Sequence, residues 1–236
     1  MKYVFGVDIG GTTVKIGLFD VEGNVLDKWE IPTRTENDGE EILPDVADSI
    51  REKMKQMDKD AIAGVGVGAP GPIDAGGVVH RAVNLGWKTF NVKETLEALI
   101  NLPVRAGNDA NVAALGEMWM GGGKGYKDLV VVTLGTGVGG GIIVDGRMIS
   151  GSTGAAGEIG HIHVDDTETD VCNCGNKGCL EQFASATGIT RLANKKLAST
   201  DMDSVLRGGE VSAKTVFDAV KARDPLAMEV AEQFGK

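Results

Sequence analysis

The sequence predicts an α/β protein built from two similar halves. Short β-rich segments alternate with amphipathic helical segments along much of the 236 residues, a pattern typical of sheets covered by helices. A strand, a glycine-rich turn and a second strand occur near the N-terminus and recur after residue 127, following a run of glycines that begins at residue 121. We therefore expect two α/β lobes, residues 1–118 and 119–236.

The first half is predicted to open with a β-meander, because three β-rich segments are separated by the turn sequences GGTT and EGN. In the helix that follows, apolar residues recur about every four positions, and Pro44 falls in the first turn, where proline is tolerated. The predicted strands cover residues 3–9, 14–20, 25–31, 61–70 and 102–109, and the predicted helices cover residues 40–57, 91–101 and 110–120.

The second half begins with strand, loop and hairpin, and then becomes helical. The segment 128–135 predicts a strand, 136–140 a loop, and 141–149 a hairpin that turns at Asp145-Gly146. The predicted helices span residues 180–197, 212–222 and 225–234. The last pattern has neither a capping glycine with a following turn nor a terminal strand, so we expect that the chain is cut short at its C-terminus.

Composition narrows the possible partners. The formal net charge of −10 argues against a nucleic-acid partner, because such binding depends on basic side chains that replace counterions. No apolar run approaches the roughly 18 residues that span a membrane, and no secretory signal is visible, so we expect a cytoplasmic protein without a membrane partner. The 35 glycines cluster, which predicts close approach of the backbone to a ligand.

Two glycine-threonine turns are candidate phosphate loops. The first, DIGGTTVK, offers backbone N–H groups and hydroxyls, and Asp8 at the strand end is placed to hold a hydrated Mg²⁺ ion. The second, LGTGVGGG, repeats this design, so the pair is suited to clamp a polyphosphate. An ordinary glycine hairpin is the alternative for each alone. The candidate cofactor-binding residues are Asp8, Gly10, Gly11, Thr12, Thr13, Lys15, Gly135, Thr136, Gly137 and Gly139.

Asp109 is the candidate catalytic carboxylate. It follows a predicted strand and precedes a predicted helix, a place where side chains project from the sheet edge and the helix N-terminus favours negative charge. A helix N-cap is the alternative role for Asp109, and on the local sequence alone it is the commoner one. The two roles can overlap.

All three cysteines lie within eight residues, which predicts a metal site. Cys172, Cys174 and Cys179 form C-x-C-x4-C, and His161 lies eleven residues upstream. Three thiolates and one imidazole make a tetrahedral set suited to Zn²⁺, and four protein ligands indicate a structural ion. A disulfide and reduced, unliganded cysteines are the weaker alternatives. His163 is the less favoured histidine, because it alternates with His161 along a predicted strand.

The motifs DIGGTTVK, GAPGPID, NDANVAALGE, LGTGVGGG, GAAGEIGH and CNCGNKGCLE occur in the order and approximate spacing of the ROK family of sugar kinases and sugar-responsive repressors. The resemblance runs from Asp8 to about residue 195, and CLEQFASATGITRLA is most similar to the family's glucokinases. It implies an actin-like or hexokinase-like fold of two ribonuclease H-like lobes, with an interlobe cleft for ATP and a hexose. Family members continue through a further segment that helps to hold the adenosine.

The resemblance also implies roles for individual residues. Asp109 is implied as the general base, and sugar contacts are implied for Gly71, Asn108, Asp109, Glu158, His161 and Glu181. The implied cofactors are ATP with Mg²⁺ and a structural Zn²⁺ ion held by His161 and the three cysteines. A homodimer is the family expectation.

The function expected from this resemblance is ATP-dependent phosphorylation of glucose at its 6-hydroxyl. Kinases of N-acetylmannosamine, N-acetylglucosamine or fructose are alternatives in the same class. A sugar-sensing repressor without its DNA-binding domain is a less favoured alternative. An actin-like ATPase is a further alternative function, and it would not explain the cysteine segment.

Overall fold

The computed structural model describes residues 2–235, which form two compact units. The first unit comprises the chain up to Val131 together with Gly141–Gly157, and the second comprises Val132–Gly140 together with the chain from Glu158. The bounds of these units differ from those of the predicted lobes, because the lobes were predicted to meet between residues 118 and 119. The division into those lobes stays a prediction.

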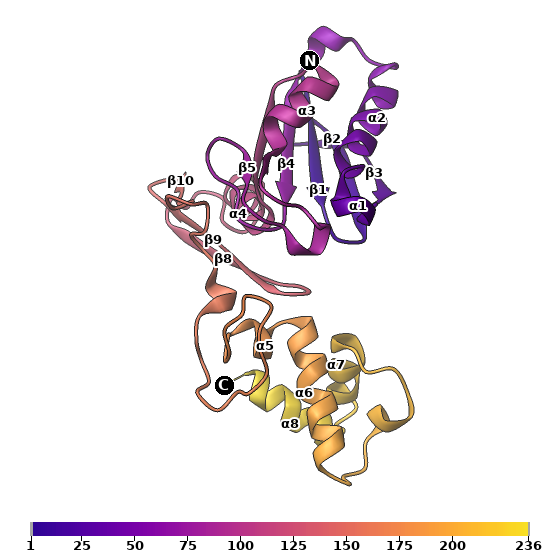
Figure 1. The fold of residues 1–236 in the computed structure, drawn as a ribbon, viewed down its shortest axis with the longest axis vertical. Helices are drawn as coiled ribbons and strands as arrows, with labels where there is room; N and C mark the ends of the chain where they lie inside the picture. The colour runs from indigo at the N-terminus through magenta and orange to yellow at the C-terminus, as the bar shows by residue number, and fades with distance from the viewer. Residues whose placement is uncertain (1, 236) are drawn as a thin grey trace. The chain divides into compact units, whose positions relative to one another are not determined.

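The first unit is built on a five-stranded sheet with the order β3-β2-β1-β4-β7 (Figure 1). β1, β2 and β3 pair antiparallel as the predicted meander, whereas β4 and β7 extend the sheet in parallel. The strands are β1 (Tyr3–Ile9), β2 (Thr13–Asp20), β3 (Val25–Pro32), β4 (Ile62–Ala69) and β7 (Val104–Asn108).

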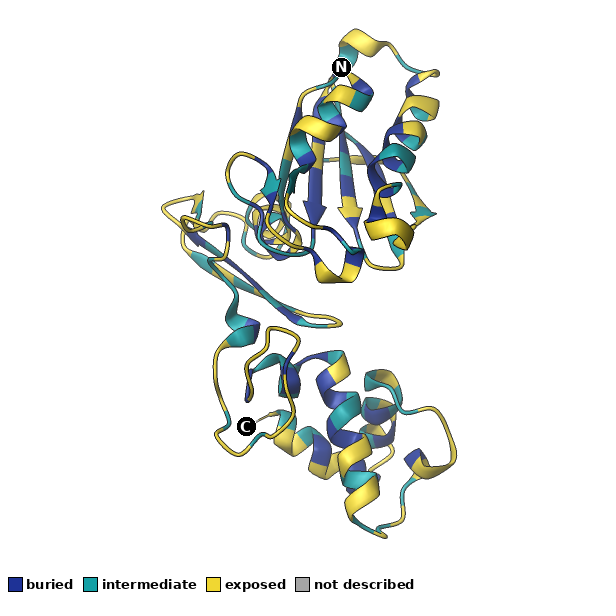
Figure 2. Cartoon of the chain, viewed as in Figure 1, coloured by how far each residue is buried: buried dark blue, intermediate teal, exposed yellow. Residues whose placement is uncertain are grey.

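Helices cover both faces of this sheet. α2 (Ile42–Met54) and α3 (Val92–Ile100) share a buried apolar core with one face, to which Val67 contributes. Successive residues of a strand point to opposite faces. Gly68 therefore faces the other way, toward Val112 of α4 (Asp109–Met120). Figure 2 shows the buried residues concentrated along the strands and the inner sides of α2 and α3.

Short elements complete the first unit and lead toward the second. The short elements are α1 (Glu36–Gly39), η1 (Lys59–Ala61), β5 (Val78–Val79), η2 (Val83–Leu85) and β6 (Phe90–Asn91).

A separate sheet has the order β10-β9-β8, formed by β8 (Leu129–Leu134), β9 (Val138–Val144) and β10 (Arg147–Met148). Asp145 and Gly146 both have positive φ, as expected for the predicted tight turn. β9 begins at Val138, so the prediction that Gly139 lies in a loop is wrong.

The second unit is mainly helical after the cysteine segment. It contains η3 (Ile159–His161), α5 (Glu181–Ala184), α6 (Ala186–Ser199), η4 (Val205–Gly208), α7 (Ala213–Lys221) and α8 (Pro225–Phe234). The predicted single helix 180–197 is wrong, because Ser185 is extended (φ −89°, ψ 166°) and separates α5 from α6.

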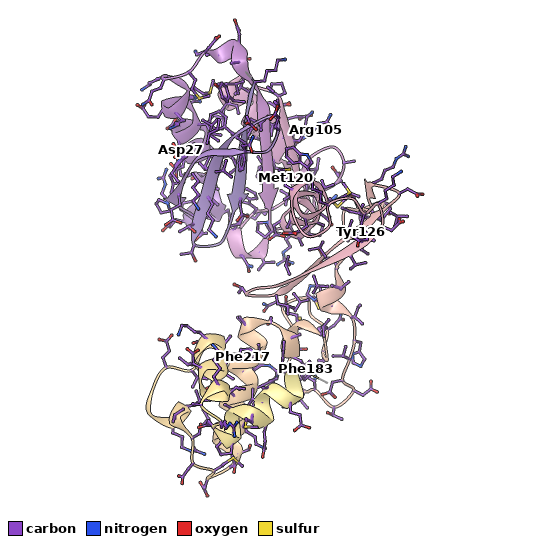
Figure 3. All side chains as sticks on the ribbon, turned by 180° about the vertical axis from the view of Figure 1, so that it is seen from behind. Asp27, Arg105, Met120, Tyr126, Phe183 and Phe217 are labelled. Atoms are coloured by element: carbon purple, nitrogen blue, oxygen red, sulfur yellow. The ribbon has the colours of Figure 1, made fainter. Side chains whose placement is uncertain are left out.

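The helices of the second unit enclose their own apolar core. Leu192, Val216 and Leu226 are buried in it, and Phe183 and Phe217, both labelled in Figure 3, pack against it. Within residues 2–235, no helix is long and apolar enough to cross a membrane.

Candidate active site and metal centre

The first glycine-threonine turn is held in a fixed shape by a neighbouring threonine. The N–H of Gly10 donates to the carbonyl of Thr13 (3.0 Å), which closes the turn. The Thr33 hydroxyl donates to the carbonyl of Gly10 (2.7 Å), and the Thr33 N–H donates to that of Thr12 (3.0 Å). Apart from that of Gly10, the backbone N–H groups around the exposed Gly11 are not used by these bonds and are available to a ligand.

Asp8 and Lys15 flank this turn on the two strands that it joins. They lie opposite each other in the antiparallel ladder of β1 and β2, and both are exposed. One face of the turn thus carries a carboxylate and an ammonium group, the two charges expected at a site for a phosphate and its metal ion.

Asn108 fixes the junction between β7 and α4. Its Oδ1 accepts from the N–H of Asn111 (3.1 Å), and its Nδ2 donates to the carbonyl of Gly71 (3.1 Å). Gly71 has φ +86°, and a Cβ there would lie 2.2 Å from the carbonyl oxygen of Arg81, so the position requires glycine. Asn108, rather than Asp109, is therefore the N-cap of α4.

Asp109 is the first residue of α4, and its carboxylate accepts a hydrogen bond from the N–H of Ala110 (2.7 Å). Its side chain reaches solvent, but the surrounding protein displaces part of the carboxylate's hydration. This desolvation raises the pKa of Asp109; the Ala110 hydrogen bond opposes the rise, and the negative charge of Asp8 adds to it. A carboxylate with a raised pKa is a stronger proton acceptor.

The second glycine-threonine turn is closed by a hydrogen bond from the N–H of Gly135 to the carbonyl of Gly137 (3.0 Å). The start of α6 also holds it: the N–H of Ala186 donates to the Gly135 carbonyl (2.9 Å), and the Thr187 hydroxyl donates to the Thr136 carbonyl (2.7 Å). In both turns, backbone carbonyl groups accept hydrogen bonds from residues outside the motif.

Glu181 connects this turn to the cysteine segment. Its Oε2 accepts from the N–H of Val138 (3.0 Å), and a Cβ on Gly137 would lie only 2.1 Å from the same oxygen. Its Oε1 lies 4.0 Å from the sulfur of Cys172. Glycine at position 137 thus lets the carboxylate approach the turn.

The predicted metal ligands converge in the second unit. One ligand atom from each of His161, Cys172, Cys174 and Cys179 lies within 4.8 Å of all the others. The sulfurs of Cys174 and Cys179 are 3.6 Å apart, and the Cys172 sulfur lies 3.8 Å from Nδ1 of His161. Ligands about 2.0–2.3 Å from a tetrahedral Zn²⁺ ion are separated by about 3.3–3.8 Å. The two separations of 3.6 and 3.8 Å fall in this range, so the cluster could hold such an ion.

The two neighbouring histidines have different partners. The Nε2 of His161 lies 3.8 Å from the Glu158 carboxylate, on the opposite side of the ring from Cys172. His163 instead bonds the carbonyl of Lys177 (2.9 Å) and the carboxylate of Asp166 (2.8 Å). His161 is thus in the metal cluster and His163 is not. The expected strand over both is wrong, because His161 ends the 3₁₀ helix η3.

The fold shifts the pKa values of the three thiols in different directions, and against burial the hydrogen bonds from Asn176 and the neighbouring thiols lower the pKa of Cys174. Burial raises the pKa of the Cys172 thiol, and burial together with the neighbouring thiols raises the pKa of Cys179 to about 12. A divalent cation compensates for such effects, because it binds the thiolate form and releases the proton.

The structure groups the predicted site residues into two sets. The first unit holds Asp8, the first turn, Gly71, Asn108 and Asp109, and the second unit holds the second turn, Glu158, Glu181 and the metal ligands. Thr33 and Thr187, which hold the two turns, were not predicted from the sequence. They are separated from their partners by 23 and 51 residues, so no local motif marks them.

The family model described as ROK family matches residues 4–236, nearly the whole chain. The chain belongs to the ROK family. The resemblance inferred from the six motifs is thereby confirmed, and so is the mixed α/β fold, which is that of the actin-like ROK hexokinase structures.

Three ROK proteins illustrate the range of relatives. A glucokinase from Halalkalibacterium halodurans is 43% identical, over 98% of this chain and 72% of its own length. The crystal structure of a ROK family glucokinase from Streptomyces griseus, in complex with glucose and AMPPNP, has a TM-score of 0.81 and 33% identity, over 98% of this chain and 75% of that one. A ROK family transcriptional regulator has a TM-score of 0.86 and 28% identity, over 99% of this chain and 59% of its own.

Proposed function

We propose that this protein catalyses the ATP-dependent phosphorylation of glucose at its 6-hydroxyl to give glucose 6-phosphate. The similarity to glucokinases over nearly the whole chain supports this function. The observation that carries it is the position of Asp109: its carboxylate lies at the end of a sheet strand, in the unit that holds the first phosphate turn, and has a raised pKa.

Asp109 is proposed to accept the proton of the attacking sugar hydroxyl. Loss of that proton makes the oxygen a better nucleophile toward the γ-phosphorus of ATP, and ADP leaves. Asn108 is held by Gly71 and by the start of α4, so it offers a fixed amide to sugar hydroxyls. Glu158, His161 and Glu181 are proposed to bind further hydroxyls of the sugar.

The two glycine-threonine turns are proposed to bind the ATP phosphates. Those backbone N–H groups of Gly10–Thr13 and Gly135–Gly139 that are not bonded within the protein, together with Lys15, would compensate for charge that develops during transfer. Asp8 is proposed to hold the Mg²⁺ ion, which neutralises phosphate charge when it is bound. The charges and the exposed backbone around Gly11 fit this role.

His161, Cys172, Cys174 and Cys179 are proposed to hold a structural Zn²⁺ ion. The spacing of their ligand atoms supports this assignment. Four protein ligands leave no open coordination position for chemistry. The proposed role of the ion is to fix His161 and the cysteine segment beside Glu158 and Glu181.

Two other functions have support in the family. Relatives include an N-acetylgalactosamine kinase from Shewanella and an N-acetylmannosamine kinase from Shigella flexneri, 30% and 34% identical to this chain. The similarity to the transcriptional regulator described above favours a regulatory role as a second candidate, and the family resemblance implies that such a role would be sugar sensing. Turnover separates these candidates, because sensing requires sugar binding but no ADP release.

We further propose that the protein acts in the cytoplasm and that it forms a homodimer, the latter as the family resemblance implies. Light scattering coupled to size-exclusion chromatography tests the dimer: a mass corresponding to one chain at micromolar concentration would contradict it.

The direct test of function is ADP release, coupled to an indicator enzyme and measured across a panel of hexoses. We expect release that depends on both ATP and sugar, with the highest kcat/KM for glucose. A higher value for an N-acetylhexosamine would change the substrate assignment. Sugar binding without any release would favour the sensor, and ATP hydrolysis unaffected by every sugar would contradict both.

A further inference from the structure

The cysteines lie on a segment that has almost no regular structure of its own. Between η3 and α5 there is neither a helix nor a strand, only isolated bridges, and Gly175 and Gly178 both have positive φ. Such a segment loses conformational freedom when a metal ion orders it, and this cost weakens binding unless other contacts hold the segment beforehand.

The side chain of Gln182, in α5, joins residues 170 and 179 of this segment. Its Oε1 accepts from the N–H of Cys179 (3.1 Å), and its Nε2 donates to the carbonyl of Asp170 (3.0 Å). The residue is buried, with 8% of its surface exposed, so water competes little for either bond. One amide therefore closes residues 170–179 into a loop.

Arg191, in α6, binds the end of the loop at Asp170. It donates to the carbonyl of Gln182 (2.7 Å) and to the carboxylates of Asp170 (2.9 Å) and Glu168 (2.6 Å). Its guanidinium group also lies over the ring of Phe183, 5.4 Å from the centroid. The hydrogen bond from Arg191 of α6 to the Gln182 carbonyl thus holds Gln182 in place independently of the loop that its side chain closes.

We propose that Gln182 is a positioning residue of the metal centre: it closes the cysteine segment before the metal arrives and so lowers the cost of metal binding. This inference rests on the zinc site proposed above. The two hydrogen bonds of the Gln182 amide go to backbone groups of Cys179 and Asp170, so Gln182 acts through the backbone of the segment. Cys172 and Cys174 lie between these two residues, so fixing both ends restricts all three thiolates.

The test compares metal affinities of the wild-type protein, Gln182→Leu and the matched control Gln233→Leu, which alters an exposed glutamine of α8. Metal-free protein is titrated with Co²⁺, whose thiolate absorption reports the ligand set, and Zn²⁺ is then added in competition. We expect Gln182→Leu to bind both ions about 10- to 100-fold more weakly, the range seen when support of a metal ligand is lost. Its absorption at saturation should match wild type, and the control should bind as wild type does.

The outcomes separate this inference from the zinc site itself. A wild-type protein that binds neither ion contradicts the site. A wild-type protein that binds, with Gln182→Leu within twofold of it, overturns the role of Gln182. A lower melting temperature of the metal-free variant with unchanged metal affinity also overturns it, because that pattern indicates a contribution to folding alone.

A second variant decides the question if circular dichroism shows that Gln182→Leu does not fold. Gln182→Glu has nearly the same shape and keeps an acceptor for the Cys179 N–H, but a carboxylate cannot donate to the Asp170 carbonyl. We expect an affinity about tenfold below wild type. Wild-type affinity in this variant would overturn the proposal.

Discussion

Asp109 is free for chemistry because its neighbour takes the structural role. The cap of α4 is the amide of Asn108, which is buried and also bound to Gly71. The carboxylate of Asp109 keeps a raised pKa, so the fold disfavours its ionised form. A carboxylate whose ionised form the fold disfavours is typical of a functional position rather than of a position selected for stability.

We therefore predict opposite effects of Asp109→Asn on activity and stability. Loss of the general base should lower kcat by about 10²- to 10⁴-fold. A carboxyl whose pKa is raised on folding stabilises the fold below its unfolded pKa, and this contribution is lost as pH rises through the folded value. At pH 7 the neutral amide should thus leave the melting temperature equal or higher.

Steady-state kinetics and a thermal melt of the same preparations check this prediction. The exposed Asp201 provides the control, since Asp201→Asn should leave both quantities unchanged. The acid limb of the wild-type kcat/KM profile should also have its midpoint above the ordinary aspartate pKa of about 3.9. Near-normal turnover in Asp109→Asn would remove Asp109 from the mechanism.

At the scale of elements, the start of α6 connects two parts of the proposed site. Ser185 ends α5 and caps α6, and the next two residues bind the carbonyl groups of Gly135 and Thr136. The cysteine segment, which leads into α5, and the second phosphate turn are therefore supported by one short junction.

The prediction at this scale concerns the cap itself. The buried Ser185 hydroxyl accepts from the N–H of Gly188 (2.9 Å) and donates to the carbonyl of Glu181 (2.7 Å). Ser185→Ala leaves these groups without this partner and should lower the free energy of unfolding by about 1 kcal/mol. Urea denaturation followed by circular dichroism measures it.

Ser199, at the other end of α6, is the matched control. It is exposed, and its hydroxyl donates only to Lys196 within the last turn. Ser199→Ala should change the free energy of unfolding by less than about 0.5 kcal/mol. Equal effects of the two substitutions would show that the cap makes no special contribution.

At the scale of the whole molecule, residues 2–235 form two apolar cores that share no residues. One includes the sheet, α2 and α3 of the first unit, and the other joins α6, α7 and α8 of the second (Figure 2). All three tryptophans, Trp29, Trp87 and Trp119, belong to the first unit. Tryptophan fluorescence therefore reports on that unit, whereas circular dichroism reports on the helices of both.

We predict that core substitutions affect the two units separately. Leu96 and Leu226 are fully buried in the first and second cores, so truncation to alanine should cost about 2–5 kcal/mol in each. Leu96→Ala should shift the fluorescence transition in urea, and Leu226→Ala should shift only the circular dichroism transition. If Leu226→Ala shifts both transitions equally, the two units unfold as one.

Much of the fold could be predicted from the sequence because its signals are local. The opening meander, α2 with Pro44 in its first turn, and the Asp145-Gly146 hairpin follow from alternation, helical periodicity and turn residues. The metal ligands could be predicted for the same reason, since they lie within nineteen residues. The break at Ser185 was missed, because the apolar periodicity continues across it.

The sequence by itself determined the α/β class, the ROK resemblance, and the residue types of the proposed site. Only the tertiary structure decided which residue caps α4 and which side chains support the turns and the cysteine loop. The physical reason is distance along the chain. Asn108 and its partner Gly71 are 37 residues apart in the sequence, and Thr187 and its partner Thr136 are 51 residues apart. Such hydrogen bonds exist only after the chain has folded.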